Sequence, residues 1–227
     1  MAKTVVIFEG EEYSGESLTD RELTVLHAQL PMLSADNGFL TQLFNDNLGK
    51  IQGALEVAKA DIGGPFTGLS AGDSELGMQI IRPGYVRRST AATEAITNDW
   101  AFTFAVTTDY WLGFGTDNTT AINVDKRILV MPMAVGWTQG PNPVVEELLI
   151  QLGQTTYPVN VIRHGWYADN PNRIRAARIR PMVWRPKSRP LVQTNQVNAG
   201  VDQLVLLGLT FGKGDLLRTL APSTIQT

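Results

Sequence analysis

An apolar stripe with the period of an α-helix runs along residues 40–62, and no other feature constrains the fold as strongly. Its members recur mostly at spacings of three or four residues: Leu40, Leu43, Phe44, Leu48, Ile51, Leu55, Ala58 and Ile62. A helix with this pattern has one continuous apolar face, which must be buried against another element. The stripe therefore predicts a long helix that begins near Ser34 or Asp36 and packs on a core.

An earlier helix is predicted from the segment Thr19-Asp20-Arg21-Glu22, which has the form of a capping box. The Thr19 hydroxyl can accept a hydrogen bond from the amide of Glu22, while the Glu22 carboxylate accepts one from the amide of Thr19. Pro31 is expected to end this helix. The two helices predict an N-terminal helical region over residues 1–62.

Two glycines, Gly49 and Gly53, lie four residues apart within the stripe. Each costs about 1 kcal/mol relative to alanine inside a helix. Either another backbone approaches the helix closely there, or the helix tolerates two weak positions. We take them, with four stripe members, as candidate helix-packing residues. The set is Gly49, Gly53, Phe44, Leu48, Ile51 and Leu55.

Residues 63–96 are rich in glycine and proline and carry few periodic apolar positions. This texture predicts an arm or loop with one short strand at Met78–Ile81. A loop of this length is unusual inside a compact domain. We therefore expect it to lie against a neighbouring copy or to carry a binding site.

Residues 97–227 have the pattern of a β domain. Short alternating or apolar runs predict strands at 100–107, 128–135, 157–162, 173–180, 182–184, 191–197 and 204–211. Residues 144–152 are ambiguous between strand and helix because Glu146 and Glu147 interrupt them. Since no helices alternate with these strands, the fold class is α+β and mainly β, with helices followed by an antiparallel β-sandwich or jelly roll.

The residue types present exclude several kinds of chemistry. The sequence has no cysteine and two histidines, so disulfides, thiolate metal sites and cysteine nucleophiles are impossible. Phosphate-loop, dinucleotide-binding, calcium-loop and nucleophile-elbow motifs are not found. We therefore expect no enzyme, with no catalytic or metal-binding residue, no cofactor and no small-molecule substrate.

Neither a membrane span nor a secretory signal is expected. No stretch approaches the roughly 20 apolar residues that cross a bilayer. The first apolar run, before Glu9, is shorter than the roughly 7–15 residues of a secretory signal core.

Paired carboxylates near aromatic residues leave one catalytic or binding alternative. Asp99, Asp109, Glu146 and Glu147 accompany Trp100, Tyr110 and Trp111 in the sequence. A carbohydrate-binding or carbohydrate-cleaving β-sandwich could use such a mixture. No spacing selects one carboxylate pair over another.

The net charge of −3 hides an asymmetry along the chain. Residues 1–99 hold 7 basic and 14 acidic residues, a net charge of −7, whereas residues 100–227 hold 12 basic and 8 acidic residues, a net charge of +4. Eight basic residues gather within 163–189 and are candidates for an interface or for anion contacts. They are Arg163, Arg173, Arg175, Arg178, Arg180, Arg185, Lys187 and Arg189.

Three interpretations of this basic segment stay open. Its side chains are solvated or paired within the chain, they meet the acidic front (residues 1–99) of another copy, or they bind nucleic acid through phosphates. A protein that binds nucleic acid is usually basic overall, and this chain is not.

The C-terminal part resembles virion structural proteins of bacteriophages and other viruses. The runs Arg180-Pro-Met-Val-Trp-Arg-Pro-Lys-Ser-Arg-Pro-Leu-Val-Gln and Gly200-Val-Asp-Gln-Leu-Val-Leu-Leu-Gly are similar in style to the late strands of jelly-roll capsid subunits. The resemblance covers roughly the last fifty residues and includes no diagnostic motif. It implies a capsid, cement or connector-type subunit that is made in a host cytoplasm and located in the virion.

The partners implied by the resemblance are copies of the chain itself, other virion proteins and packaged nucleic acid. We expect the purified protein to form defined oligomers or larger assemblies. High salt should loosen them if the charge asymmetry joins the copies.

Overall fold

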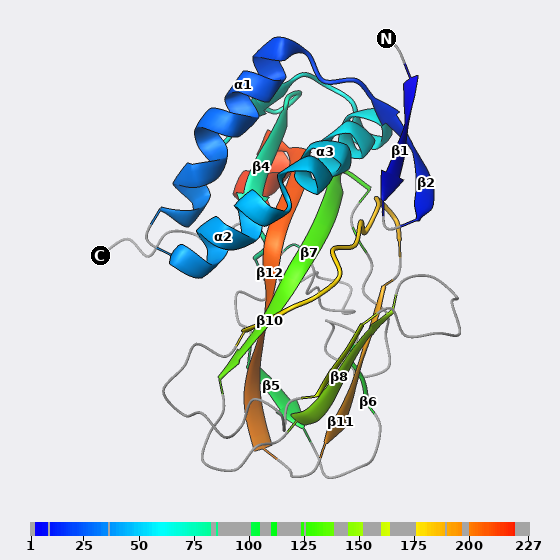
Figure 1. The fold of residues 1–227 in the computed structure, drawn as a ribbon, viewed down its shortest axis with the longest axis vertical. Helices are drawn as coiled ribbons and strands as arrows, with labels where there is room; N and C mark the ends of the chain where they lie inside the picture. Colours follow the sequence, from blue (N-terminus) through cyan, green and yellow to red (C-terminus); the bar gives the residue numbers. More distant parts are fainter. Residues whose placement is uncertain are drawn as a thin grey trace.

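Three helices gather over one face of a long, twisted sheet in the computed structural model of the chain (Figure 1). The architecture is α+β, as the sequence predicts. The structure describes residues 3–8, 10–35, 37–82, 85, 101–104, 110–112, 124, 126–138, 145–151, 160–163, 176–188, 190–196 and 200–220.

A β-hairpin precedes the helices and corrects the prediction that residues 1–62 are helical. Strand β1 (Lys3–Phe8) pairs antiparallel with β2 (Glu11–Glu16). Burial alternates along β1, as the side-chain period of a strand requires. Val6 and Phe8 are buried, whereas the side chains between them are exposed.

The first helix confirms the predicted capping box. Helix α1 (Asp20–Gln29) has Thr19 as its N-cap, and the reciprocal Thr19 and Glu22 bonds are both present. A 3₁₀ helix, η1 (Leu30–Ser34), follows with Pro31 in its first turn. The predicted end of the helix is therefore correct to within two residues.

The apolar stripe forms two helices rather than the single long one predicted. They are α2 (Gly38–Asp46) and α3 (Leu48–Ile62), and they meet at Asn47. The Asn47 side chain donates to the carbonyl oxygen of Leu43 at 2.8 Å. This bond competes with the helical backbone and explains the break. The stripe itself lies on the core side of both helices, as predicted.

Residues 63–82 form strands where a loop with one strand was predicted. Strands β3 (Phe66–Gly68) and β4 (Leu76–Ile80) pair in parallel and belong to the central sheet. The strand predicted at Met78–Ile81 is present as β4, which begins two residues earlier and ends one residue earlier. The parallel pair makes the sheet mixed, so the prediction of purely antiparallel pairing is wrong here.

The central sheet has the strand order β10-β7-β12-β4-β3, and β5 (Ala101–Phe104) pairs with the start of β12. Its backbone is the long antiparallel pair of β7 (Ile128–Thr138) and β12 (Gly200–Lys213). Strand β10 (Ala176–Arg178) pairs with β7, and helix α5 (Gly214–Leu220), which the sequence did not predict, follows β12.

A second, four-stranded sheet has the order β6-β11-β8-β9 and is antiparallel throughout. It lies beside the lower half of β12 in Figure 1. Its strands are β6 (Tyr110–Leu112), β8 (Val145–Gln151), β9 (Asn160–Arg163) and β11 (Leu191–Gln196). Within the ambiguous run 144–152, the described residues Val145–Gln151 therefore form a strand.

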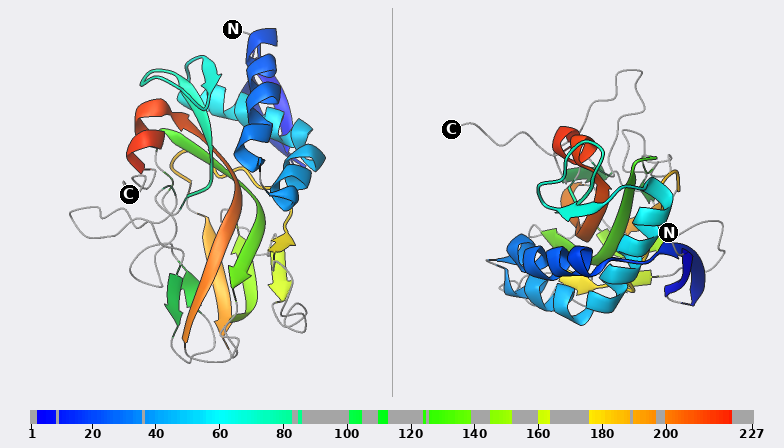
Figure 2. Two further views of the ribbon diagram at one scale, coloured as in Figure 1. Left: turned by 90° about the vertical axis from the view of Figure 1, so that its left-hand side faces the viewer. Right: turned by 90° about the horizontal axis from the view of Figure 1, so that it is seen from above.

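Alternation along β7 and β12 divides the core between two faces of the sheet. Leu129 and Phe211 belong to the cluster under the three helices, together with Ile51 and Leu55. The intervening residues of β7 point to the other face, where Trp184 is fully buried beside β7. The helices and the hairpin are thus fixed on one side of a sheet that is covered on both sides (Figure 2).

Candidate functional site

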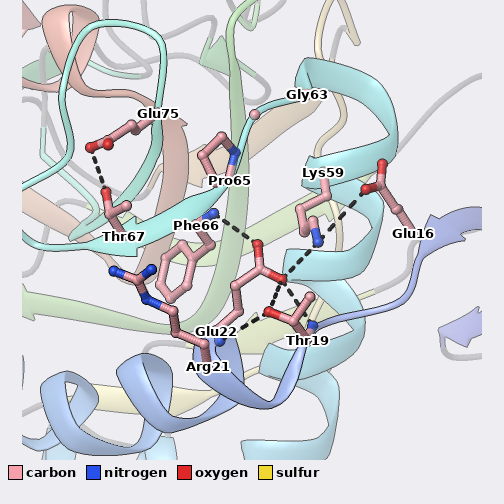
Figure 3. Close-up of a pocket in the computed structure, with 11 residues that line it drawn as sticks. Glu16, Thr19, Arg21, Glu22, Lys59, Gly63, Pro65, Phe66, Thr67 and Glu75 are labelled. Carbon is pink, nitrogen blue, oxygen red and sulfur yellow. Dashed lines mark hydrogen bonds and ion pairs between the residues drawn. The ribbon is translucent and has the colours of Figure 1, made fainter. Parts of the chain in front are cut away.

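A pocket with polar groups lies between the end of β2, the start of α1 and the loop after α3 (Figure 3). Its volume is about 530 Å³. The residues lining it are Glu16, Thr19, Arg21, Glu22, Lys59, Gly63, Gly64, Pro65, Phe66, Thr67 and Glu75.

The Glu22 carboxylate stands at the base of this pocket and is only 5% exposed. One oxygen accepts from the Phe66 amide at 2.9 Å. The other accepts from the Thr19 amide and hydroxyl, each at 2.9 Å, and from Lys59 Nζ at 2.8 Å. Four donors, from the N-cap of α1, from α3 and from β3, therefore converge on a single side chain.

Lys59 is buried as deeply as Glu22, and its ammonium is satisfied within the chain. Besides Glu22, it contacts the Ser17 carbonyl oxygen at 3.2 Å and a Glu16 oxygen at 3.7 Å. Burial alone would raise the pKa of Glu22, but the Lys59 ammonium and the three hydrogen bonds from Phe66 and Thr19 lower it to about 2.

The electrostatics of the pocket base indicate a structural role. A carboxylate with a pKa of about 2 is ionised at neutral pH, and its two oxygens already accept four hydrogen bonds. It is therefore unsuited to act as a general acid or base. The pair instead joins α1 to α3 and β3 and, through Glu16, to the hairpin.

The rim of the pocket is held in a similar way. A Glu75 oxygen accepts from the Gly72 amide at 2.7 Å and from the Thr67 hydroxyl at 2.9 Å. These bonds lower the pKa of Glu75, and the nearby Arg21 guanidinium adds to the effect. Lys213 Nζ donates to the carbonyl oxygens of Gly63 and Ser74 and so ties the end of β12 to this loop.

Arg185, one of the predicted basic candidates, connects the hairpin to the body. Its guanidinium donates to both carboxylate oxygens of Asp61, with Nε at 2.8 Å from Oδ2. The same group lies over the Tyr13 ring, 5.9 Å from the centroid. Such a fork-shaped, stacked contact depends on the planar guanidinium.

The other basic candidates are not brought together into one described patch. Arg178 pairs with Asp46 at 2.6 Å, and Lys187 is exposed. Arg180 is also exposed, and Arg163 lies in β9. Arg173, Arg175 and Arg189 lie outside the described residues.

The acidic front and the basic back of the chain meet within one copy. Asp46 and Asp61 pair with Arg178 and Arg185, and Asp73 pairs with Arg218. Each pair joins a residue before position 100 to one after it. For Arg178 and Arg185, the intrachain interpretation of the charge asymmetry is therefore the one that the structure supports.

The helix-packing candidates lie in the chain's own core, except Gly49, which is exposed and for which the packing prediction is wrong. Phe44, Ile51 and Leu55 are buried, and Leu48 packs against them. A Cβ on Gly53 would lie 2.9 Å from a Val6 methyl group, so the hairpin approaches α3 closely at that glycine. A Cβ on Gly49 would meet nothing within 4 Å.

The outer face of the hairpin is the most apolar exposed surface among the described residues. Val5 is 69% exposed and Ile7 is 71% exposed, and they share one face of β1. The third large exposed hydrophobic residue is Met32, in η1. Sequence reasoning missed this face, although the apolar run Val5–Phe8 before Glu9-Gly10 is compatible with the first strand of a hairpin.

Sequence reasoning also missed the charge network of the pocket. Glu22 was identified only as a capping residue, and no local pattern links it to Lys59. Of the residues invoked for the carbohydrate alternative, Asp99, Trp100 and Asp109 lie outside the described residues. The rest lie in strands: Tyr110 and Trp111 in β6, and Glu146 and Glu147 in β8.

Searches for known sites and relatives return no match. Within the described ranges, no group of three histidine or acidic side chains is placed to hold a metal ion. None of the helices there is long and apolar enough to cross a membrane. No protein-family model matches the chain, and no curated protein shows detectable sequence similarity to it.

Proposed function

We propose that the chain is a structural subunit that acts by self-association, in the manner of a virion capsid, cement or connector protein. The observation that carries the proposal is the outer face of the hairpin. Large apolar side chains exposed on a strand usually mark a surface that another chain covers. Val5 and Ile7 form such a surface on a rigidly anchored element.

The anchoring of the hairpin supports this role. Its inner face packs on α3 through Val6 and Phe8, and Arg185 holds it at Tyr13. A surface that is fixed before association loses less conformational entropy when it binds. The buried charge network beneath the pocket fixes the neighbouring elements in the same way.

The virion setting follows from the sequence resemblance. Under this proposal, the central and four-stranded sheets are the two layers of a β-sandwich of the jelly-roll type, and the helices pack on the central sheet. The partners are copies of the chain and other virion proteins, and no small molecule is acted on. Contact with packaged nucleic acid would fall to basic residues other than Arg178 and Arg185, which are engaged within the chain.

The experiment is to measure the oligomeric state of the purified chain and to image it. Light scattering after size exclusion should show a defined oligomer, and electron micrographs should show discrete or extended assemblies. A protein that stays strictly monomeric at high concentration and low salt would refute the proposal. Tryptophan fluorescence that responds to sugars would favour the carbohydrate alternative instead.

A further inference from the structure

We infer that the free edge of β1 pairs antiparallel with β1 of a second copy, so that the two hairpins form one four-stranded sheet. This inference rests on the proposed function and names the surface through which copies associate. Among the described strands, β1 pairs only with β2. The view from above in Figure 2 places the hairpin at the margin of the molecule, beside α3.

The hairpin geometry determines which backbone groups face the free edge. Two residues separate the strands, and Phe8 stands opposite Glu11. In a hairpin with a two-residue connection, the pair flanking it is hydrogen-bonded, and hydrogen-bonded pairs then alternate with open ones. Lys3, Val5 and Ile7 are therefore the residues whose N–H and C=O groups point outward.

These outward groups have no other backbone partner in the described structure. No residue of β1 makes a backbone hydrogen bond to a described residue outside the hairpin. The edge is also accessible, because all three outward-pointing residues are exposed. An exposed strand edge of this kind is a ready template for adding another strand.

One register uses all three outward residues. If Val5 stands opposite Val5 of the second copy, Lys3 stands opposite the second copy's Ile7, and the reverse pair is equivalent by two-fold symmetry. Each of these three pairs exchanges two bonds, which gives about six hydrogen bonds in all. A shift of two residues in either direction leaves one outward residue unpaired.

Charge selects β1 rather than β2 as the joining edge. On the outer face, the second copy's Glu12 lies beyond Ile7 in the row of Lys3, whereas Glu16, the partner of Lys3 in β2, turns its carboxylate toward Lys59. Each Lys3 ammonium thus shares its row with the exposed Glu12 carboxylate of the other copy. Pairing through β2 centred on Ser14 would instead place Glu12 directly opposite Glu16 of the other copy, twice. Like charges directly opposite each other destabilise a sheet.

The absence of native cysteine allows a clean test by single-cysteine cross-linking. In the inferred register, the Cα atoms of the two Val5 residues lie about 5.5 Å apart, within the range that a disulfide spans. Val5→Cys should therefore form a covalent dimer under mild oxidation. Met32→Cys, also exposed but away from the hairpin, provides the rate of chance encounters.

Ser14→Cys distinguishes the two edges. It lies opposite Val5 on β2, so it should cross-link no faster than Met32→Cys if β1 joins the copies. Fast cross-linking of Ser14→Cys with slow cross-linking of Val5→Cys would assign the interface to β2 and overturn the inference. If the wild type associates and neither variant cross-links quickly, the inference fails while the proposed function stands. A strictly monomeric wild type would refute both the inference and the proposed function.

A charge variant tests the register without cross-linking. Ile7→Lys would place an ammonium opposite Lys3 of the second copy in two symmetric pairs, and we expect association to weaken about tenfold. Adding Lys3→Glu should restore association. Because Ile7 is 71% exposed, thermal unfolding of the monomer should stay unchanged and serves as the folding control. Unchanged association of Ile7→Lys would overturn the inference.

Discussion

Replacing Glu22 by Gln should remove the ion pair that joins α1 to α3 and weaken the bond from α1 to β3. The side chain keeps its shape but loses its charge, while Lys59 stays buried at 5% exposure. The folded state lowers the pKa of Glu22 from 4.5 to about 2, which corresponds to about 3 kcal/mol in favour of the ionised, folded form. This value agrees with the loss in folding stability, roughly 3–5 kcal/mol, that follows when one partner of a buried ion pair is removed.

The pH dependence has a definite sign. Because the folded-state pKa lies below the unfolded-state value, the contribution of Glu22 is fully present above about pH 4.5. It declines as the pH falls toward about 2, where the folded-state carboxylate takes up its proton. The wild type should therefore lose about 3 kcal/mol more than Glu22→Gln across this window.

The assay is urea unfolding followed by tryptophan fluorescence, since Trp184 is fully buried and reports on the core. Glu12→Gln, the same chemical change on the exposed outer face of the hairpin, is the matched control and should stay within about 0.5 kcal/mol of the wild type. Combining Glu22→Gln with Lys59→Met should recover part of the loss, because no unpaired ammonium remains buried. A Glu22→Gln protein as stable as Glu12→Gln, with the wild-type acid profile, would refute the reasoning.

Two further perturbations follow from local geometry, and both can be measured by thermal or urea unfolding. Gly49→Ala should stabilise the chain by up to about 1 kcal/mol, because the new Cβ would meet nothing within 4 Å. Gly208→Ala should destabilise it by more than about 2 kcal/mol, because the new Cβ would lie 2.1 Å from the Met131 carbonyl oxygen. Equal effects of the two substitutions would contradict this. Arg185→Lys should cost about 1 kcal/mol of stability, since it loses the two-pronged bond to Asp61 and the contact with Tyr13. Arg178→Lys, at an exposed pair with Asp46, should change stability by less. A larger loss for Arg178→Lys than for Arg185→Lys would contradict this geometry.

The helical part of the fold could be predicted because its signals are local. The Thr19–Glu22 capping box and the apolar stripe depend on spacings of three and four residues, and both are present as expected. The break at Asn47 was missed because a side-chain bond to Leu43 competes with the helix there. Several strands of the second half, such as β7 and β12, were located from apolar runs, but β6 was missed and the predicted strand at 182–184 is only an isolated bridge at Trp184.

The parts that could not be predicted depend on contacts between distant residues. The parallel pairing of β3 with β4 spans a short connection, with Phe66 opposite Leu76, yet no local residue pattern encodes it. The Glu22–Lys59 pair spans 37 positions, and Arg185 reaches Asp61 across 124. The hairpin is different, because its signal is local: an apolar run, Val5–Phe8, is followed directly by Glu9-Gly10.

The intrachain pairs change what salt should do to an assembly. If copies met through the acidic front and the basic back, high salt would loosen them, because screening shortens the Debye length to about 3 Å at about 1 M. Asp46, Asp61 and Asp73 are instead paired within their own chain. An interface built on β1 has an apolar centre and backbone hydrogen bonds, which salt weakens little. Sedimentation at low and high sodium chloride should therefore give dissociation constants within about tenfold of each other. Complete dissociation at high salt would show that charged surfaces, rather than the hairpin edge, hold the copies together.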